Sequence, residues 1–111
     1  MPAPTITRQP ERRASARVVA EVELTLSRGR GNPVVGRTLD LGAGGMRVAT
    51  ARPLAVDEVV AFDFSLDGLA GAVRGEARVL REYARQTYSL RFEKLAAEEA
   101  AALASFVSRA G

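Results

Sequence analysis

Short segments in which every second residue is apolar constrain the fold of this chain more than any other feature. The clearest runs from Val18 to Leu26, and its predicted buried face consists of Val18, Ala20, Val22, Leu24 and Leu26. A two-residue period is typical of a strand with one buried face. The same period favours five further strands, at residues 34–41, 46–50, 58–66, 72–82 and 88–93.

Turn residues separate these segments. Residues 27–33 contain two glycines and an Asn-Pro pair, and residues 51–57 form a loop interrupted by a proline. In the strand at 34–41, alternation predicts three core-facing residues, namely Val35, Leu39 and Leu41. Asp40 then lies on the opposite face.

The last segment changes period. Residues 97–109 are rich in Ala, Glu and Leu, which are good helix formers, and their larger apolar residues recur with a helical period. Six strands followed by one helix predict an all-β fold, a six-stranded antiparallel barrel with a C-terminal α-helix.

Composition excludes several classes of function. A chain of 111 residues forms one domain, and it contains neither cysteine nor histidine. We therefore expect no metal site, no cofactor and no enzymatic activity, because no nucleophile–base pair can be assembled. The sequence shows no apolar stretch of about 18 residues and no secretory signal pattern, so we expect a cytoplasmic protein without a membrane span.

A cluster of cations precedes the first strand. Arg8, Arg12, Arg13 and Arg17 lie within the first seventeen residues, and only Glu11 opposes them. Arginine binds phosphate or the O6/N7 edge of guanine through two parallel hydrogen bonds. The alternative is a solvated basic tail, as charged N-termini often form. We take residues 1–10 as a flexible tail and residues 11–17 as a binding arm.

A carboxylate and a glycine-rich turn follow the second strand. Asp40 lies one residue before the end of that strand, and Gly42, Gly44 and Gly45 follow the strand within four residues. Glycine in such a turn indicates positive φ angles or a close backbone approach. A carboxylate can accept hydrogen bonds from guanine, so the turn and the arm together would suit a guanine nucleotide. Alternatively, Asp40 only caps the turn and the glycines only serve hairpin geometry.

These two motifs resemble those of the PilZ domain, the bacterial receptor module for cyclic di-GMP. The family pattern is an R-x-x-x-R arm followed by [D/N]-x-S-x-x-G, and this chain has Arg13-Ala-Ser-Ala-Arg17 and Asp40-Leu-Gly-Ala-Gly-Gly45. The resemblance covers residues 11–109. It implies that Arg13 and Arg17 bind guanines and phosphates of cyclic di-GMP, that Asp40 takes a guanine edge and that Gly45 allows close approach.

Three positions qualify the resemblance. Arg12, just before the arm motif, is similar to PilZ domains that take an intercalated pair of cyclic di-GMP molecules. Gly42 replaces the motif serine and removes a hydroxyl, which should lower affinity about tenfold or less. Ser89 stands where many relatives have glycine, and it would either crowd a ligand or supply the missing hydroxyl.

The expected organisation is a PilZ-like domain at residues 11–111, with the barrel at 18–93 and the helix at 97–109. We expect a cyclic di-GMP receptor whose arm becomes ordered on binding and which signals to an unidentified effector protein, with a homodimer left open. The alternatives are a degenerate PilZ-type adaptor with weak or no nucleotide binding and, less favoured for lack of stacking aromatics, a nucleic-acid-binding barrel. We expect no nucleic-acid partner.

Overall fold

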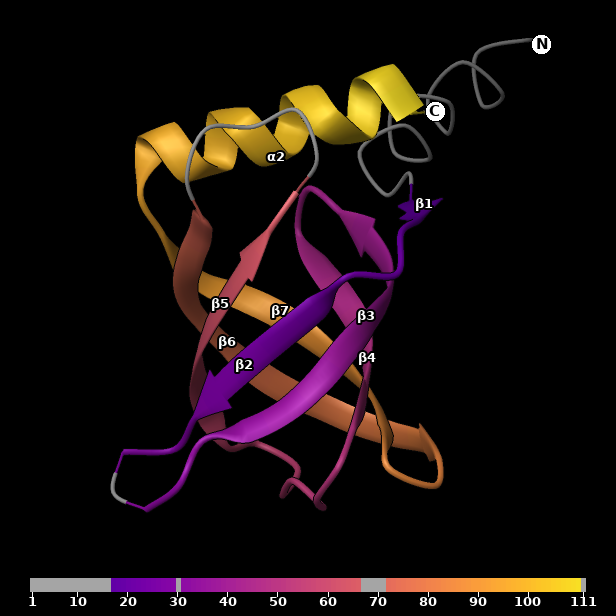
Figure 1. Cartoon of the computed structure of the whole chain (residues 1–111), viewed down its shortest axis with the longest axis vertical. Coiled ribbons are helices and arrows are strands. Elements are labelled where there is room, and N and C mark those ends of the chain that lie inside the picture. The colour runs from indigo at the N-terminus through magenta and orange to yellow at the C-terminus, as the bar shows by residue number, and fades with distance from the viewer. Residues whose placement is uncertain (1–16, 30, 67–71, 111) are drawn as a thin grey trace, which may run out of the picture.

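The computed structural model describes residues 17–29, 31–66 and 72–110, which include seven strands and one helix (Figure 1). In chain order the elements are β1 (Arg17–Val19), β2 (Glu23–Ser27), β3 (Val34–Gly42), β4 (Gly45–Thr50), β5 (Val59–Ser65), β6 (Ala72–Ala84), β7 (Thr87–Leu95) and α2 (Ala97–Ala110).

The strands close into a barrel. All pairings are antiparallel, and the order β3-β2-β5-β6-β7-β4 is completed by a pairing of β4 with β3. The short strand β1 pairs with the end of β3, on the same edge that β2 uses nearer its start. The predicted six-stranded antiparallel barrel with a C-terminal helix is therefore confirmed, with β1 as an extension of the first strand.

The prediction of one continuous strand from Val18 to Leu26 is wrong, because the chain breaks between β1 and β2. The fully buried side chain of Thr38 bridges this break. Its hydroxyl accepts a hydrogen bond from the N–H of Val22 at 3.0 Å and donates one to the carbonyl of Ala20. Backbone groups that leave the ladder are thus paired within the protein, as buried polar groups must be.

The buried face predicted for β3 is wrong in the first half of the strand and correct at its end. Val34 is buried and Val35 is 51% exposed, which is the reverse of the alternation that the sequence suggested. The pairing of β3 with β4 shifts between Thr38 and Asp40, so Leu39 is an extra residue that inverts the phase. Leu41 is therefore buried as predicted, and the side chain of Asp40 is mostly covered but remains on the outer side.

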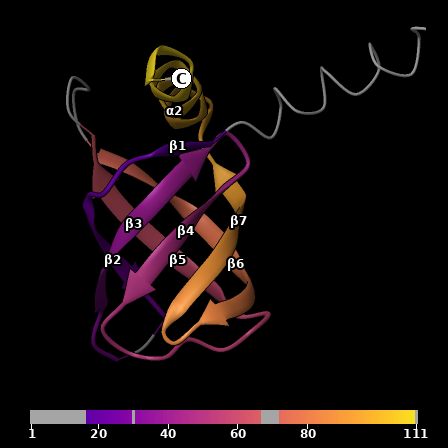
Figure 2. The same ribbon diagram turned by 90° about the vertical axis from the view of Figure 1, so that its right-hand side faces the viewer.

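The core follows the predicted pattern in the remaining strands. Successive side chains of β4, β5 and β7 alternate between core and solvent. The core includes Met46, Val48, Val60, Phe62, Phe64, Tyr88 and Leu90. The buried phenol of Tyr88 accepts a hydrogen bond of 2.9 Å from the N–H of Leu54. Helix α2 lies across one end of the barrel, where Leu103 and Val107 are buried and where the helix contacts β1, β3 and β6 (Figure 2).

Three glycines permit the tight curvature of the barrel. A Cβ at Gly36, Gly45 or Gly75 would overlap the backbone carbonyl of Ala49, Leu90 or Lys94 on the neighbouring strand. Glycine at such points lets strands coil closely over each other, as closure of a small barrel requires.

The described part of the chain contains no helix that is both long enough and apolar enough to cross a membrane. The predicted tail at 1–10 and the arm residues 11–16 lie outside the described residues.

Candidate functional site

The centre of the candidate site is an ion pair between the last arm residue and the hairpin carboxylate. The pairing of β1 with β3 aligns Arg17 with Gly42 and Val19 with Asp40. Nη1 of Arg17 donates a hydrogen bond of 2.9 Å to Oδ1 of Asp40. Their side chains are 35% and 16% exposed, so the pair faces solvent on the arginine side and is partly shielded on the carboxylate side.

A second cation, which the sequence analysis did not single out, approaches the same carboxylate. Nε of Arg47 lies 3.7 Å from Oδ2 of Asp40, because the two residues are opposite each other in the β3–β4 hairpin. The sequence could have indicated this pairing, because a two-residue turn at Ala43 and Gly44 places Asp40 opposite Arg47 in the hairpin. With two guanidiniums around one carboxylate, this region of the barrel surface carries excess positive charge and attracts anions.

Arg47 also contacts an aromatic ring. Its guanidinium carbon lies 5.3 Å from the ring centroid of Tyr83, which is within the range of a cation–π interaction. Tyr83 lies on β6, and β7 separates β6 from β4. The contact therefore depends on the pairing of β7 with both β4 and β6, and no local sequence signal could have indicated it.

Ser89 lies on the same outer surface. It is opposite Arg47 on one side and opposite Arg81 on the other, while its neighbours Tyr88 and Leu90 are buried. The structure therefore places four of the residues in one row across β3, β4, β7 and β6: Asp40, Arg47, Ser89 and Arg81.

The glycines of the predicted turn have different surroundings. Gly42 is buried at the end of β3, beside Arg17 of β1. Gly45 lies against the backbone of Leu90, so barrel geometry alone requires glycine there. Gly44 is exposed and would have no atom within 4 Å of an added Cβ. None of these three glycines is among the positive-φ residues, so close approach, rather than a left-handed turn, explains Gly45.

The other predicted ligand-binding residues, Arg12 and Arg13, lie outside the described residues. Arg17 is thus the part of the arm motif whose position relative to Asp40 is defined.

Next to the site, Glu93 is held by two arginines. Nε of Arg78 donates a hydrogen bond of 2.8 Å to Glu93, and Nη2 of Arg91 donates one of 3.1 Å. These hydrogen bonds, first that from Arg78 and then that from Arg91, lower the pKa of Glu93 from 4.5 to about 2. Glu93 therefore stays ionised under all ordinary conditions and balances two of the arginines on this side of the barrel.

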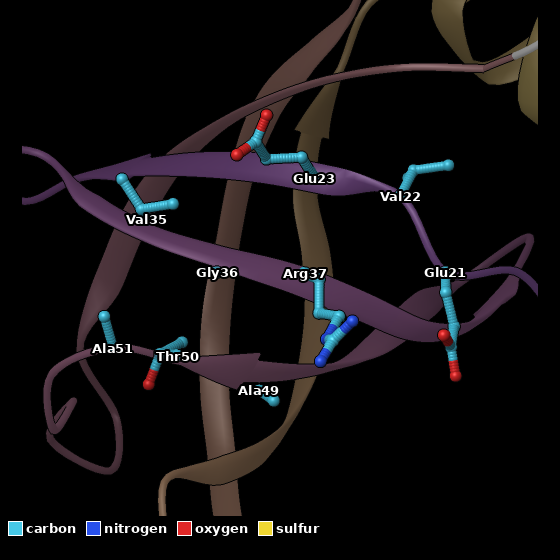
Figure 3. A pocket seen from close by; sticks show the side chains of 9 residues that line it. All are labelled: Glu21, Val22, Glu23, Val35, Gly36, Arg37, Ala49, Thr50 and Ala51. Carbon is cyan, nitrogen blue, oxygen red and sulfur yellow. The ribbon is translucent and has the colours of Figure 1, made fainter.

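A hollow of about 450 Å³ lies along the outer side of β3, beside the candidate site (Figure 3). Its lining comes from β2, β3, β4 and the segments next to them, and includes Glu21, Glu23, Gly36 and Arg37. It does not include Arg17, Asp40 or Arg47. The ion pairs of Asp40 and this hollow therefore occupy adjoining parts of the surface.

In the part of the chain that the structure describes, no three acidic side chains are gathered in a way that could hold a metal ion. The donors and acceptors of the site are guanidiniums, a carboxylate and a hydroxyl. Guanidiniums bind anions and base edges through paired hydrogen bonds.

Comparisons with known proteins identify the family of the chain. The family model described as PilZ domain matches residues 11–109. The chain is similar in structure to the inhibitor of motility (MotI/DgrA) of Bacillus subtilis, with a TM-score of 0.72 and 18% identity over 85% of this chain and 48% of that chain. It thus spans about half the length of that protein, 48%.

A second similar structure is the PilZ domain of CeSA from a cellulose-synthesizing bacterium, with a TM-score of 0.64 and 21% identity over 84% of this chain and 95% of that chain. These identities are low, so the two likenesses show the fold. No curated protein matches the chain significantly. Because the family model extends from the arginine arm through the barrel to the closing helix, the chain belongs to the PilZ domain family, a family of receptors and adaptors related to cyclic di-GMP.

Proposed function

We propose that this protein is a receptor that binds cyclic di-GMP without catalysis, on the outer surface around Arg17 and Asp40. The observation that carries the proposal is the 2.9 Å contact between these two side chains, which joins the end of the arginine arm to the hairpin carboxylate. The family to which the chain belongs supports the choice of ligand.

The side chains of the site match the hydrogen-bonding groups of a guanine nucleotide. The carboxylate of Asp40 accepts hydrogen bonds from the N1–H and amino group of guanine, while Arg17 donates to O6 and N7 or to a phosphate. In the structure Arg17 occupies Oδ1 of Asp40 and Arg47 approaches Oδ2. Binding therefore exchanges a contact within the protein for contacts with the ligand, while a second cation stays near the carboxylate.

Arg13 and Arg12 complete the proposed site. Arg13 is four residues before Arg17, and both would bind guanines and phosphates of the same ligand. Arg12 would assist a second, intercalated cyclic di-GMP molecule. Contacts at both ends of the arm would fix residues 11–17 relative to β1 and present a new surface to an effector protein.

Two residues tune the affinity. Gly42 supplies no hydroxyl where the family motif has serine, which costs about one neutral hydrogen bond, or roughly tenfold or less in affinity. Ser89 has its small hydroxyl side chain in the same row as Asp40 and Arg47. This position favours a role as a donor or acceptor toward the ligand, in place of the missing serine.

Titration calorimetry with cyclic di-GMP tests the proposal. The native chain should bind with micromolar or tighter affinity, and the double variant Arg13→Ala/Arg17→Ala should lose measurable binding. Arg74→Ala is the matched control, since Arg74 is 71% exposed and pairs with Asp63 between β5 and β6, away from the site. Heat of equal size from the native chain and the double variant would reject the site, and absence of heat from the native chain would reject the ligand.

A second candidate function is an adaptor that binds a protein and has little or no nucleotide affinity. Two departures from the family motif favour it: Gly42 supplies no hydroxyl where the motif has serine, and Ser89 stands where many relatives have glycine. The same titration discriminates, because an adaptor of this kind gives no heat with cyclic di-GMP.

A further inference from the structure

The pair formed by Arg47 and Tyr83 has no assigned role in the site described above. We propose that Arg47 is a stacking platform for a purine base of the bound nucleotide and that Tyr83 is a positioning residue that holds the guanidinium flat. The proposal rests on the proposed function. It extends the proposed site from Asp40 over the outer surface of β4 and β7 to β6.

Two contacts of different kinds, one with a carboxylate and one with an aromatic ring, define the position of Arg47. Oδ2 of Asp40 lies 3.7 Å from Nε of Arg47, whose guanidinium carbon lies over the ring of Tyr83, 5.3 Å from the ring centroid. The side chain of Arg47 is still 47% exposed. A guanidinium that has two such neighbours and is still about half exposed leaves part of its planar surface for a flat ligand, and arginine stacks on nucleobases.

The local backbone aims Tyr83 at this position. The pairing of β6 with β7 is irregular between Glu82 and Ala84, so Tyr83 is the extra residue of a β-bulge. Bulges redirect side chains and are frequent beside functional sites. Tyr83 remains 40% exposed, so the bulge does not serve to bury its ring in the core.

Ser89 makes the contact across β7 possible. It lies between Arg47 of β4 and Arg81 of β6 in the row of paired residues, and its side chain is small. The ring of Tyr83 can therefore reach Arg47, whereas a long side chain at this position of β7 would stand between them. The same residue that departs from the family's common glycine thus still leaves room for the pair.

The arrangement divides the recognition of the nucleotide between two kinds of contact. Asp40 and Arg17 address the hydrogen-bonding edge of guanine, which identifies the base. Arg47 addresses its face, which adds affinity without choosing between bases, because every base has a π-face. A purine with its edge at Asp40 lies within reach of Arg47, since the two side chains are in contact.

Calorimetric titration with cyclic di-GMP of the native chain and of Arg47→Lys, Tyr83→Ala and Tyr83→Phe tests the inference. Arg47→Lys keeps the charge and loses the flat face, and we expect about tenfold weaker binding. Tyr83→Ala should weaken binding by about threefold to tenfold, whereas Tyr83→Phe, which keeps the ring, should bind like the native chain. Leu80→Ala is the matched control on β6, since Leu80 is 42% exposed and also lies at a bulge.

The outcomes separate the inference from the proposed function. Native-like binding by Arg47→Lys shows that only charge matters and overturns the stacking role, while the receptor function stands. Native-like binding by Tyr83→Ala, or equal weakening in Tyr83→Phe and Tyr83→Ala, overturns the role of the ring. Absence of binding by the native chain overturns both proposals. The melting temperature of each variant is measured alongside, and Arg47→Lys decides the matter if Tyr83→Ala does not fold.

Discussion

Arg17 donates a hydrogen bond of 2.9 Å to Asp40, a residue 23 positions later in the chain. The contact exists because β1 pairs with the last three residues of β3, which places the end of the arginine arm beside the glycine hairpin. The two motifs that mark the chain as a PilZ domain therefore meet at one point on the barrel surface.

The first prediction concerns Asp40. Replacing it by Asn should change the free energy of unfolding by less than about 1 kcal/mol, because the ion pair with Arg17 is partly exposed. The same change should weaken cyclic di-GMP binding by about tenfold to a hundredfold, because a charge-assisted acceptor for guanine is lost. Urea unfolding and calorimetry measure the two effects. A large loss of stability would assign Asp40 to the fold and remove it from the site.

Thr38 supports the site from inside the barrel. Thr38→Val should lower the free energy of unfolding by about 2 kcal/mol or more, since the N–H of Val22 and the carbonyl of Ala20 lose their partner at the break between β1 and β2. Because β1 carries Arg17, ligand affinity should fall as well. Thr38→Ser keeps the hydroxyl and is the control. Equal stability of the Val and Ser variants, measured by urea unfolding, would contradict this role for the hydroxyl.

Gly45 and Gly44 form a matched pair in one turn. Gly45→Ala should destabilise the fold by about 1–3 kcal/mol, because the added methyl meets the backbone of Leu90 and Arg91, which cannot rotate away. Gly44→Ala should change stability by less than about 0.5 kcal/mol, since nothing lies within 4 Å of its Cβ position and its φ is not positive. Thermal unfolding of both variants checks the difference, and similar melting temperatures would disprove it.

The pH dependence of stability should reveal Glu93. Its pKa is lowered from 4.5 to about 2 in the folded protein by hydrogen bonds from Arg78 and Arg91. A depressed folded-state pKa stabilises the fold above the unfolded value and loses this effect as pH falls through the folded value. The native chain should therefore melt above Glu93→Gln at pH 6, and the gap should close between about pH 4.5 and pH 2. A gap that stays constant over this range would contradict the assignment.

Most of the fold could be read from residue periodicity. The alternation from Val60 to Phe64 and at Tyr88 and Leu90 predicted the buried face correctly, since a strand's two-residue period depends only on local backbone geometry. The helical period predicted Leu103 and Val107 in the same way. The two motifs also predicted that the arm and the hairpin meet, and the structure brings Arg17 of the arm into contact with Asp40 of the hairpin. The ligand-binding roles of Arg12, Arg13, Gly42, Gly45 and Ser89 remain predictions.

Errors arose where strands depend on their neighbours. Alternation placed Val35 in the core, but the extra residue Leu39 inverts the phase of β3, and a bulge is set by the pairing partner. The break between β1 and β2 depends on the hydroxyl of Thr38, sixteen residues beyond Val22.

The sequence by itself determined the six strands, the helix and the residues of the two motifs, because those signals are local. Only the tertiary structure decided which outer side chains share a surface, since the pairing of β7 with both strands brings β6 near β4 and places Tyr83 against Arg47. Period and composition act along the chain, whereas register, bulges and closure are decided between strands.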